Sequence, residues 1–255
     1  MTADGRPKTT LGHWDGTWSM PSRLRLPSSL WVSERNLRRV LRAHVRPGAS
    51  VLEVGCAPGK TLAWVARALG ARVAGIDYSE RGIGFAAELF KAIGIRGDLR
   101  CEDMFATSFP PDAFDLVYSV GLVEHFDDPA PVIESHVRLT RPGGRTLVLV
   151  PNYGGVYGRL QRYFHPENLA LHNLGIMNEA ALRSLAPPTL VDDVGAFRAG
   201  RMSPWLLSFE RRWPTSLSRP LQLALNAAGL VQPFDIRWLC PMVALSMRRM
   251  AKLAC

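Results

Sequence analysis

The chain has 255 residues, of which 47% are hydrophobic and 21% charged, and its formal net charge at pH 7 is +9. This composition is ordinary for a soluble globular protein, and the length suits one α/β domain with additions. No apolar run reaches the about 18–20 residues that a membrane-spanning helix needs. The first eight residues also lack the apolar core of a signal peptide. We therefore expect a cytoplasmic protein without a transmembrane segment.

The cysteines show neither close pairing nor the spacing of metal ligands; they are Cys56, Cys101, Cys240 and Cys255. Reduced thiols in the cytoplasm explain them, and we expect no metal site.

The amino-terminal region divides into two parts. Residues 1–20 are rich in Gly, Thr and Trp and predict an irregular segment. Residues 28–45 place Leu37, Val40 and Leu41 at helical spacing. We expect this helix to cap the ligand site of the domain that follows.

Residues 50–60 read Ser-Val-Leu-Glu-Val-Gly-Cys-Ala-Pro-Gly-Lys. The apolar run at the start predicts a buried parallel strand, and a helical pattern follows the loop. Gly55 and Gly59 bracket that loop, so a ligand can approach the backbone and the free N–H groups of the helix start. Asp77 ends the next apolar run, where a carboxylate can accept both hydroxyls of a ribose. Together these features predict a nucleoside-bearing cofactor.

Three classes of cofactor compete for the loop. A P-loop requires Gly-x-x-x-x-Gly-Lys-Ser/Thr, but only three residues separate Gly55 from Gly59 and Val54 stands where the first glycine belongs. A dinucleotide site requires Gly-x-Gly-x-x-Gly, yet Ala57 replaces the middle glycine and no Tyr-x-x-x-Lys pair offers an acid for hydride transfer. S-adenosylmethionine sites use Glu/Asp-x-Gly-x-x-x-Gly, and Glu53, Gly55 and Gly59 match that spacing.

Residues 51–150 resemble the class I S-adenosylmethionine-dependent methyltransferases in five motifs that occur in the family's order. They are the cofactor loop at 51–59, the ribose-binding strand end at 74–79, the adenine-binding step at 101–104, the fourth-strand segment at 114–126 and the Arg-Pro-Gly-Gly turn with strand five at 139–150. The resemblance covers about two fifths of the chain. The departure is Cys56-Ala57-Pro58, where the family more often has another glycine.

Strand and helix alternate through this region, which predicts a parallel sheet with right-handed crossovers. The expected strands are 50–54, 72–76, 97–101, 114–120 and 145–150, followed by 189–194 and 240–247; the expected helices are 60–69, 80–93, 129–140, 178–186 and 217–229. The expected fold is an α/β, Rossmann-like doubly wound sheet in three layers, mostly parallel with a final antiparallel strand, an N-terminal helical cap and an insertion after strand five. The expected division is residues 1–49 as an irregular segment and cap helix, and 50–255 as the methyltransferase domain, with 151–177 as a substrate lid.

The resemblance implies a set of contacts with S-adenosylmethionine. The loop from Gly55 to Gly59, including Cys56 and Ala57, is expected to face the methionine part, while Glu53 sets up the amino group through the loop. The implied contacts beyond the loop are Asp77 to the ribose, Tyr78 packed on adenine, Asp103 and the Met104 N–H to the adenine edge, and Ser119 beside the amino acid end. Glu102 is the competing carboxylate, but strand alternation sends it to the other face.

Methyl transfer is an in-line displacement at a sulfonium, so holding the acceptor in line supplies about 7–11 kcal/mol of the barrier. A hydroxyl or ammonium acceptor must also lose a proton. His125 is the first candidate base, because it follows the fourth strand and a neutral imidazole accepts protons near neutral pH. His165 and His172 are weaker candidates, and each of the three histidines could instead only tie a loop.

Aromatic side chains concentrate in the predicted lid. Candidate acceptor-binding residues are Tyr153, Tyr157, Tyr163 and Phe164. Aromatic faces suit a flat or apolar acceptor and stabilise a passing cation; packing of the lid on the core is the alternative. Trp14, Trp18 and Trp31 could close the cofactor pocket from the amino-terminal side.

The positive charge is concentrated at the two ends of the chain. Residues 1–50 carry nine basic and three acidic groups, and residues 195–255 carry nine and two. A basic surface can bind nucleic acid, anionic lipid or an acidic substrate, but 27 of the 31 basic residues are Arg, which indicates a general preference for arginine. The Asn/Asp-Pro-Pro-Tyr/Phe motif and the Pro-Cys nucleophile of base methyltransferases are missing, which disfavours nucleic acid; contact with a membrane surface stays open.

The sequence thus predicts transfer of a methyl group from S-adenosylmethionine to a small molecule, with oxygen favoured over nitrogen and carbon. The alternatives are an RNA- or lipid-directed methyltransferase that uses the basic flanks, and a non-catalytic scaffold that binds the cofactor. The sequence does not indicate an oligomeric state.

Overall fold

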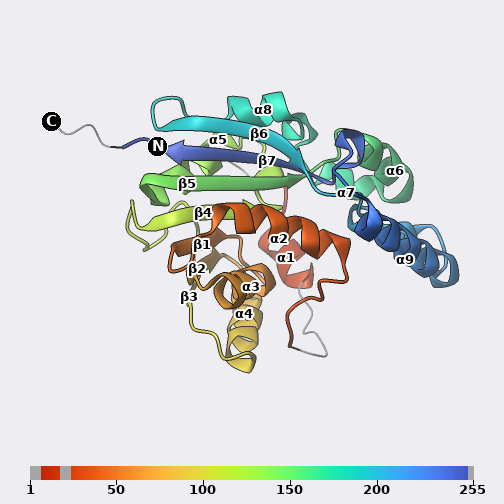
Figure 1. The fold of residues 1–255 in the computed structure, drawn as a ribbon, viewed down its shortest axis with the longest axis horizontal. Coiled ribbons are helices and arrows are strands. Elements are labelled where there is room, and N and C mark those ends of the chain that lie inside the picture. Colours follow the sequence, from red (N-terminus) through yellow and green to blue (C-terminus); the bar gives the residue numbers. More distant parts are fainter. Residues whose placement is uncertain (1–6, 18–23, 252–255) are drawn as a thin grey trace.

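A seven-stranded sheet forms the centre of the computed structural model, which describes residues 7–17 and 24–251. Its order is β3-β2-β1-β4-β5-β7-β6 (Figure 1). The strands are β1 (Ser50–Val54), β2 (Arg72–Asp77), β3 (Asp98–Cys101), β4 (Phe114–Val120), β5 (Thr140–Pro151), β6 (Val191–Ala199) and β7 (Met242–Arg249). β1 to β5 pair in parallel, and β7 runs antiparallel to both β5 and β6. The prediction of a mostly parallel sheet with a final antiparallel strand is confirmed.

Helices cover both faces of this sheet. They are α1 (Leu11–Thr17), α2 (Val32–His44), α3 (Lys60–Leu69), α4 (Glu80–Ala92), α5 (Ala130–Leu139), α6 (Val156–Phe164), α7 (Pro166–Ala170), α8 (Glu179–Ser184) and α9 (Thr215–Val231). α2, α3 and α4 pack on one face, whereas α5 and α8 pack on the other (Figure 1). The result is the expected three-layer arrangement.

Strand alternation explains why each face has its own hydrophobic core. In β1, Val51 points toward α2 and α3, while Leu52 points toward α5. In β5, Leu147 and Val148 divide between the two cores in the same way, and all four side chains are fully buried. The central strands are apolar on both sides because both of their faces are covered by helices.

The direction of strand order reverses between β1 and β4, and this reversal positions the functional site. From β1 the chain continues outward to β2 and β3, then returns to place β4 on the other side of β1. The loops after β1 and β4 therefore diverge at the carboxyl edge of the sheet and leave a crevice between them, which is where open α/β sheets bind ligands.

Several expected elements differ from the structure. Residues 11–17, expected to be irregular, form α1, and α2 begins at Val32 rather than at residue 28. α2 packs its buried residues Val40 and Leu41 on the sheet core beside α3. The insertion after β5, which showed no clean period, consists of the short helices α6 and α7 and the 3-10 turn η2 (Leu174–Ile176), each too short for periodicity to reveal.

Other short 3-10 turns are η1 (Val123–His125), η3 (Pro204–Leu206), η4 (Phe209–Arg211) and η5 (Arg237–Leu239). Within the described ranges, no helix combines the length and the apolar character required to cross a membrane.

Candidate functional site

A cavity of about 420 Å³ opens at the carboxyl edge of the sheet, within the size range of small-molecule sites. Its walls come from the ends of β1, β2 and β4, the segment after β3 and the amino-terminal segment. The lining residues are Pro7, Trp14, Val54, Gly55, Ala57, Ile76, Asp77, Tyr78, Glu102, Asp103, Met104, Phe105, Val120, Gly121, Leu122 and Phe126. The site thus forms where the strand order reverses.

The loop after β1 is held open by its backbone. Gly55 has φ +72°, a left-handed conformation that favours glycine. The N–H groups of Gly55 and Cys56 both donate to the Ile76 carbonyl, at 2.8 and 3.1 Å, which fixes the loop against the end of β2. Gly55 and Ala57 consequently line the cavity.

Asp77 lies at the edge of the cavity and is oriented by two backbone donors. The Ala57 N–H donates to Oδ2 at 3.1 Å and the Ser79 N–H donates to Oδ1 at 2.9 Å. Burial raises the pKa of Asp77, and the Ser79 and Ala57 donors oppose that rise. Both carboxylate oxygens thus have a fixed direction and retain lone pairs for the hydroxyls of a ribose.

The segment after β3 supplies another wall. Asp103 is exposed at the cavity, where its Oδ1 accepts the Phe105 N–H at 2.9 Å. Glu102 also touches the cavity, but its carboxylate accepts bonds from Thr107 and Ser108, with the Ser108 N–H at 2.9 Å. Both carboxylates thus line the cavity, and strand alternation does not separate them because β3 ends at Cys101; Asp103 is the one left available to a ligand, because Glu102 is engaged by Thr107 and Ser108.

Four of the predicted cofactor residues are outside this lining. Glu53 and Cys56 point into the core between the sheet and α3, and Ser119 is fully buried. Gly59 begins α3 with φ +84°, and a Cβ there would lie 2.6 Å from the Ala86 Cβ. Gly59 is thus required for close packing of α3 on α4. These four residues are thus packed against the sheet and helices rather than exposed to the cavity, and the spacing of residues in the sequence does not show this packing.

Sequence reasoning missed the hydrophobic walls Pro7, Phe105, Leu122 and Phe126. The available signal was position: Leu122 and Phe126 follow the carboxyl end of β4, at the edge where ligands bind. Trp14 closes the amino-terminal side as expected, whereas Trp31 lies in a different cavity beside Trp205. Trp18 falls outside the described residues.

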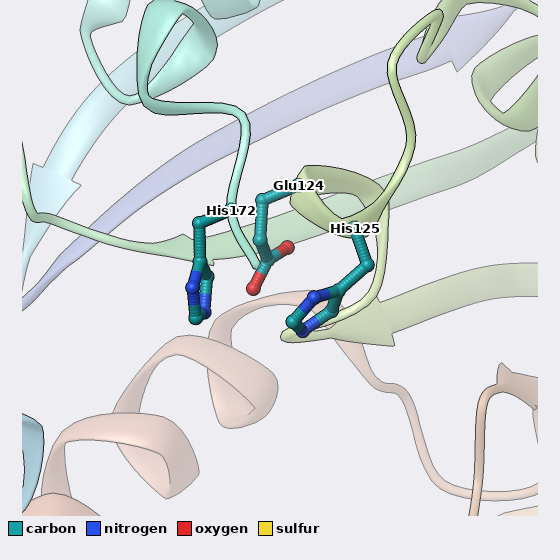
Figure 2. Close-up of side chains that lie close together, drawn as sticks. All are labelled: Glu124, His125 and His172. Carbon is teal, nitrogen blue, oxygen red and sulfur yellow. The ribbon is translucent and has the colours of Figure 1, made fainter. Parts of the chain in front are cut away.

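Beside Trp14, two histidines and a glutamate meet from two parts of the chain. Glu124 and His125 belong to η1, and His172 follows α7 in the insertion (Figure 2). The three side chains offer ligand atoms within 4.8 Å of one another. His125 contacts the Trp14 ring edge-on, with centroids 5.1 Å apart, and the His172 ring at 4.6 Å. The cluster therefore adjoins the wall of the cavity.

Burial dominates the electrostatics of this cluster. It raises the pKa of Glu124 to about 8 and lowers the pKa of His125 to about 4. The pKa of His172 is also lowered, mainly by burial. Both imidazoles are therefore neutral at pH 7.

Backbone contacts assemble the cluster from three segments. The Asn173 N–H donates to the Glu124 carbonyl at 2.6 Å, which attaches the insertion to η1. On the other side, the Lys8 N–H donates to the His125 carbonyl at 2.6 Å, and the Lys8 ammonium pairs with Asp127 at 2.7 Å. The amino-terminal segment and the insertion thus hold η1 between them.

None of the four aromatic residues predicted for the acceptor is among the residues that line the cavity. Tyr153 is buried against His172, with ring centroids 5.3 Å apart. Tyr157 is a structural tie whose hydroxyl donates to the Leu239 carbonyl at 2.9 Å. Phe164 packs in an aromatic cluster with Phe209, whereas the Tyr163 side chain is 56% exposed. Only Tyr153 adjoins the histidine cluster. His165 instead faces Glu167 at 4.0 Å.

Comparison with known proteins agrees with this architecture. Residues 51–144 match a family model described as a methyltransferase domain. Methyltransferase GfsG of Streptomyces halstedii is 32% identical over 109 residues, which cover 42% of this chain and 39% of that protein. A ubiquinone biosynthesis O-methyltransferase of Rhizobium johnstonii is 35% identical over 105 residues, covering 41% of this chain and 42% of that protein.

Among solved structures, phosphoethanolamine N-methyltransferase 2 of Haemonchus contortus, in complex with phosphomonomethylethanolamine and S-adenosylhomocysteine, is similar in fold. The TM-score is 0.59 at 19% sequence identity, over 86% of this chain and 53% of that chain. Residues 51–144 thus match a methyltransferase domain, and the chain as a whole is similar in fold to a solved methyltransferase structure. The resemblance inferred from the five motifs is confirmed. The matches span about two fifths of the length of these curated relatives.

Proposed function

We propose that this chain binds S-adenosylmethionine in the 420 Å³ cavity and transfers its methyl group to an oxygen of a small-molecule acceptor. The observation that carries the proposal is the ring contact of His125, a member of the Glu124, His125 and His172 cluster, with Trp14, a residue of the cavity wall. Groups able to act on an acceptor hydroxyl therefore adjoin the site that fits the cofactor.

The proposed cofactor contacts follow the cavity lining. The fixed Asp77 carboxylate accepts the ribose hydroxyls, and Asp103 with the Met104 N–H binds the adenine edge. Gly55 and Ala57 present the loop backbone to the methionine part. Glu53, Cys56, Gly59 and Ser119 support the loop and the strands from the core. Transfer then requires the acceptor oxygen to lie in line with the methyl and the sulfur.

Calorimetric titration tests the cofactor site. Asp77→Ala is expected to weaken S-adenosylmethionine binding at least tenfold, because hydrogen bonds to a charged group contribute about 1.5–3 kcal/mol. Asp98→Ala is a matched control, since Asp98 lies at the start of β3 and pairs with Arg100 at 2.6 Å. Equal affinity of the Asp77 variant and the wild type would refute the ribose assignment.

Turnover tests the rest of the proposal. Purified protein is incubated with cofactor labelled on the methyl group and fractionated cell extract, and the labelled product is identified. His125→Ala is expected to retain cofactor binding while losing turnover. A methylated amine or carbon in the product would refute oxygen as the acceptor, and a protein that binds the cofactor without labelling any fraction would be the scaffold.

A nucleic acid acceptor receives less support. Several arginines of the basic flanks are held by internal contacts: Arg249 donates to three backbone carbonyls, Arg248 pairs with Asp192 and Arg39 pairs with Asp235. Such contacts favour a small-molecule acceptor. A cytoplasmic location stays a prediction.

A further inference from the structure

The cluster of Glu124, His125 and His172 contains three groups that can bind the same partner. Figure 2 shows the Glu124 carboxylate between the two imidazole rings. Glu124 is 1% exposed and His125 is 7% exposed, so water satisfies little of their hydrogen-bonding capacity. An enclosed cluster of this kind requires an explanation of what its polar atoms bind.

Hydrogen bonds to the backbone determine the tautomer of both rings. His125 Nδ1 lies 2.9 Å from the Leu171 carbonyl, and His172 Nδ1 lies 2.6 Å from the Asn168 carbonyl. A carbonyl oxygen can only accept, so each Nδ1 carries the hydrogen. Each Nε2 is therefore left with a lone pair. Metal-binding histidines show this pattern, in which the second ring nitrogen donates to a carbonyl and directs the first toward the ion.

The carboxylate lacks a compensating partner. Glu124 Oε2 is buried and has no hydrogen-bond partner among the described residues. Two lone-pair nitrogens beside it supply no charge to balance its ionised form, and a cation would satisfy all three groups at once. A proton on Glu124 would also neutralise the carboxylate, and titration with Co²⁺ distinguishes the proton from a metal ion.

We propose that Glu124, His125 and His172 form a binding site for a divalent transition-metal ion of the zinc class. Two imidazoles with one carboxylate select zinc, iron or cobalt over magnesium or calcium, which prefer oxygen ligands. In a tetrahedral site, bond lengths of about 2.0–2.2 Å place ligand atoms about 3.3–3.6 Å apart, so the cluster, whose ligand atoms lie within 4.8 Å of one another, has to contract around the ion.

The ion would also have a role in the methyl transfer, and this role rests on the proposed function. Three protein ligands leave a coordination position for the acceptor oxygen. The ion lowers the pKa of the bound hydroxyl, whose proton leaves to solvent. The oxygen then forms a bond to the methyl carbon while the carbon–sulfur pair returns to sulfur, giving S-adenosylhomocysteine. In this arrangement His125 is a ligand rather than the base.

Cobalt titration of untagged, chelator-treated protein tests the site without cofactor or acceptor. One Co²⁺ per chain is expected to bind and to produce visible absorption, which zinc then abolishes by competition. Glu124→Gln and His172→Gln are expected to weaken binding at least about hundredfold, since loss of even an outer-shell partner costs about 10–100-fold. His165→Gln and Cys101→Ser, which change a loop histidine and an exposed thiol, are expected to bind as the wild type does.

Thermal unfolding by circular dichroism establishes that each variant is folded, and Glu124→Gln is nearly isosteric. A wild type that binds no stoichiometric Co²⁺, or cluster variants that bind it with unchanged affinity, would overturn the metal site. Calorimetry with S-adenosylmethionine in the presence of chelator is run on the same samples. Absence of S-adenosylmethionine binding in this calorimetry would contradict the proposed function but not the metal site, because the cobalt measurement uses no cofactor.

Discussion

The free energy of unfolding of Glu53→Gln, relative to that of the wild type, is expected to be higher at neutral pH than in acid. Glu53 is 4% exposed and lies on β1 between the sheet and α3, where burial raises its pKa from 4.5 to about 8. The nearby Asp77 charge raises the pKa further. Because the folded state holds the proton more tightly, the carboxyl contributes stability that is fully present below about pH 4.5. That stability is lost as the pH rises toward 8.

The two pKa values determine the magnitude. At 1.36 kcal/mol per pKa unit, ionisation of Glu53 destabilises the folded state by about 3 kcal/mol at pH 7 and about 1 kcal/mol at pH 5. Glutamine is neutral at both pH values. It adds a cost for its amide of about 1–3 kcal/mol that does not depend on pH. The change between pH 5 and pH 7 is therefore the informative quantity.

Urea unfolding followed by circular dichroism measures this change. The free energy of unfolding of Glu53→Gln minus that of the wild type is expected to increase by about 2–3 kcal/mol from pH 5 to pH 7. Glu88→Gln, at an exposed position of α4, serves as the control and is expected to show no such increase. A Glu53→Gln difference that is equal at both pH values would refute the reasoning.

Three further predictions concern other parts of the site. Gly59→Ala is expected to lose about 3 kcal/mol or more of the free energy of unfolding in urea, because it combines a left-handed φ with a Cβ 2.6 Å from Ala86. The control Gly70→Ala has φ +65° but open space around it, and it is expected to lose only about 1–2 kcal/mol. Trp14→Ala is expected to weaken calorimetric binding of S-adenosylmethionine about tenfold through loss of apolar contact, and an unchanged affinity would place the cofactor elsewhere. Asn173→Ala is expected to weaken Co²⁺ binding about tenfold while the protein stays folded. The Asn173 side chain holds the insertion against the loop after β4 by donating to the Phe126 and Asp127 carbonyls. Equal binding would show that this attachment does not position His172.

The parallel half of the sheet was predictable because its signals are local. The apolar runs of β1 and β4 are bounded as expected, at residues 50–54 and 114–120. α3 begins and ends at the expected residues because Gly59 and Gly70 flank it in left-handed conformations. The lid was less predictable, since α6 and α7 are short helices and α6 is held by distant segments: the Tyr157 hydroxyl donates to the Leu239 carbonyl and the Gln161 amide donates to Ser208.

The candidate site also contains residues that were predictable from the sequence and residues that were not. Asp77 and Asp103 reach the cavity because each follows a strand, and the carboxyl ends of parallel strands share one edge. Ser119 is fully buried and lies outside the cavity lining, whereas the next residue of β4, Val120, reaches the cavity, because side chains alternate along a strand.

Local patterns along the chain were sufficient to predict the order of strands and helices, the glycine loop after β1 and the acidic residues at the strand ends. These features depend on contacts between residues near one another along the chain. The tertiary structure decided that α1 rather than α2 covers the cavity, that Glu53 lies in the core, and that His172 joins Glu124 and His125. Those outcomes depend on how segments far apart in the chain pack together, a free-energy balance that no local pattern of residues encodes.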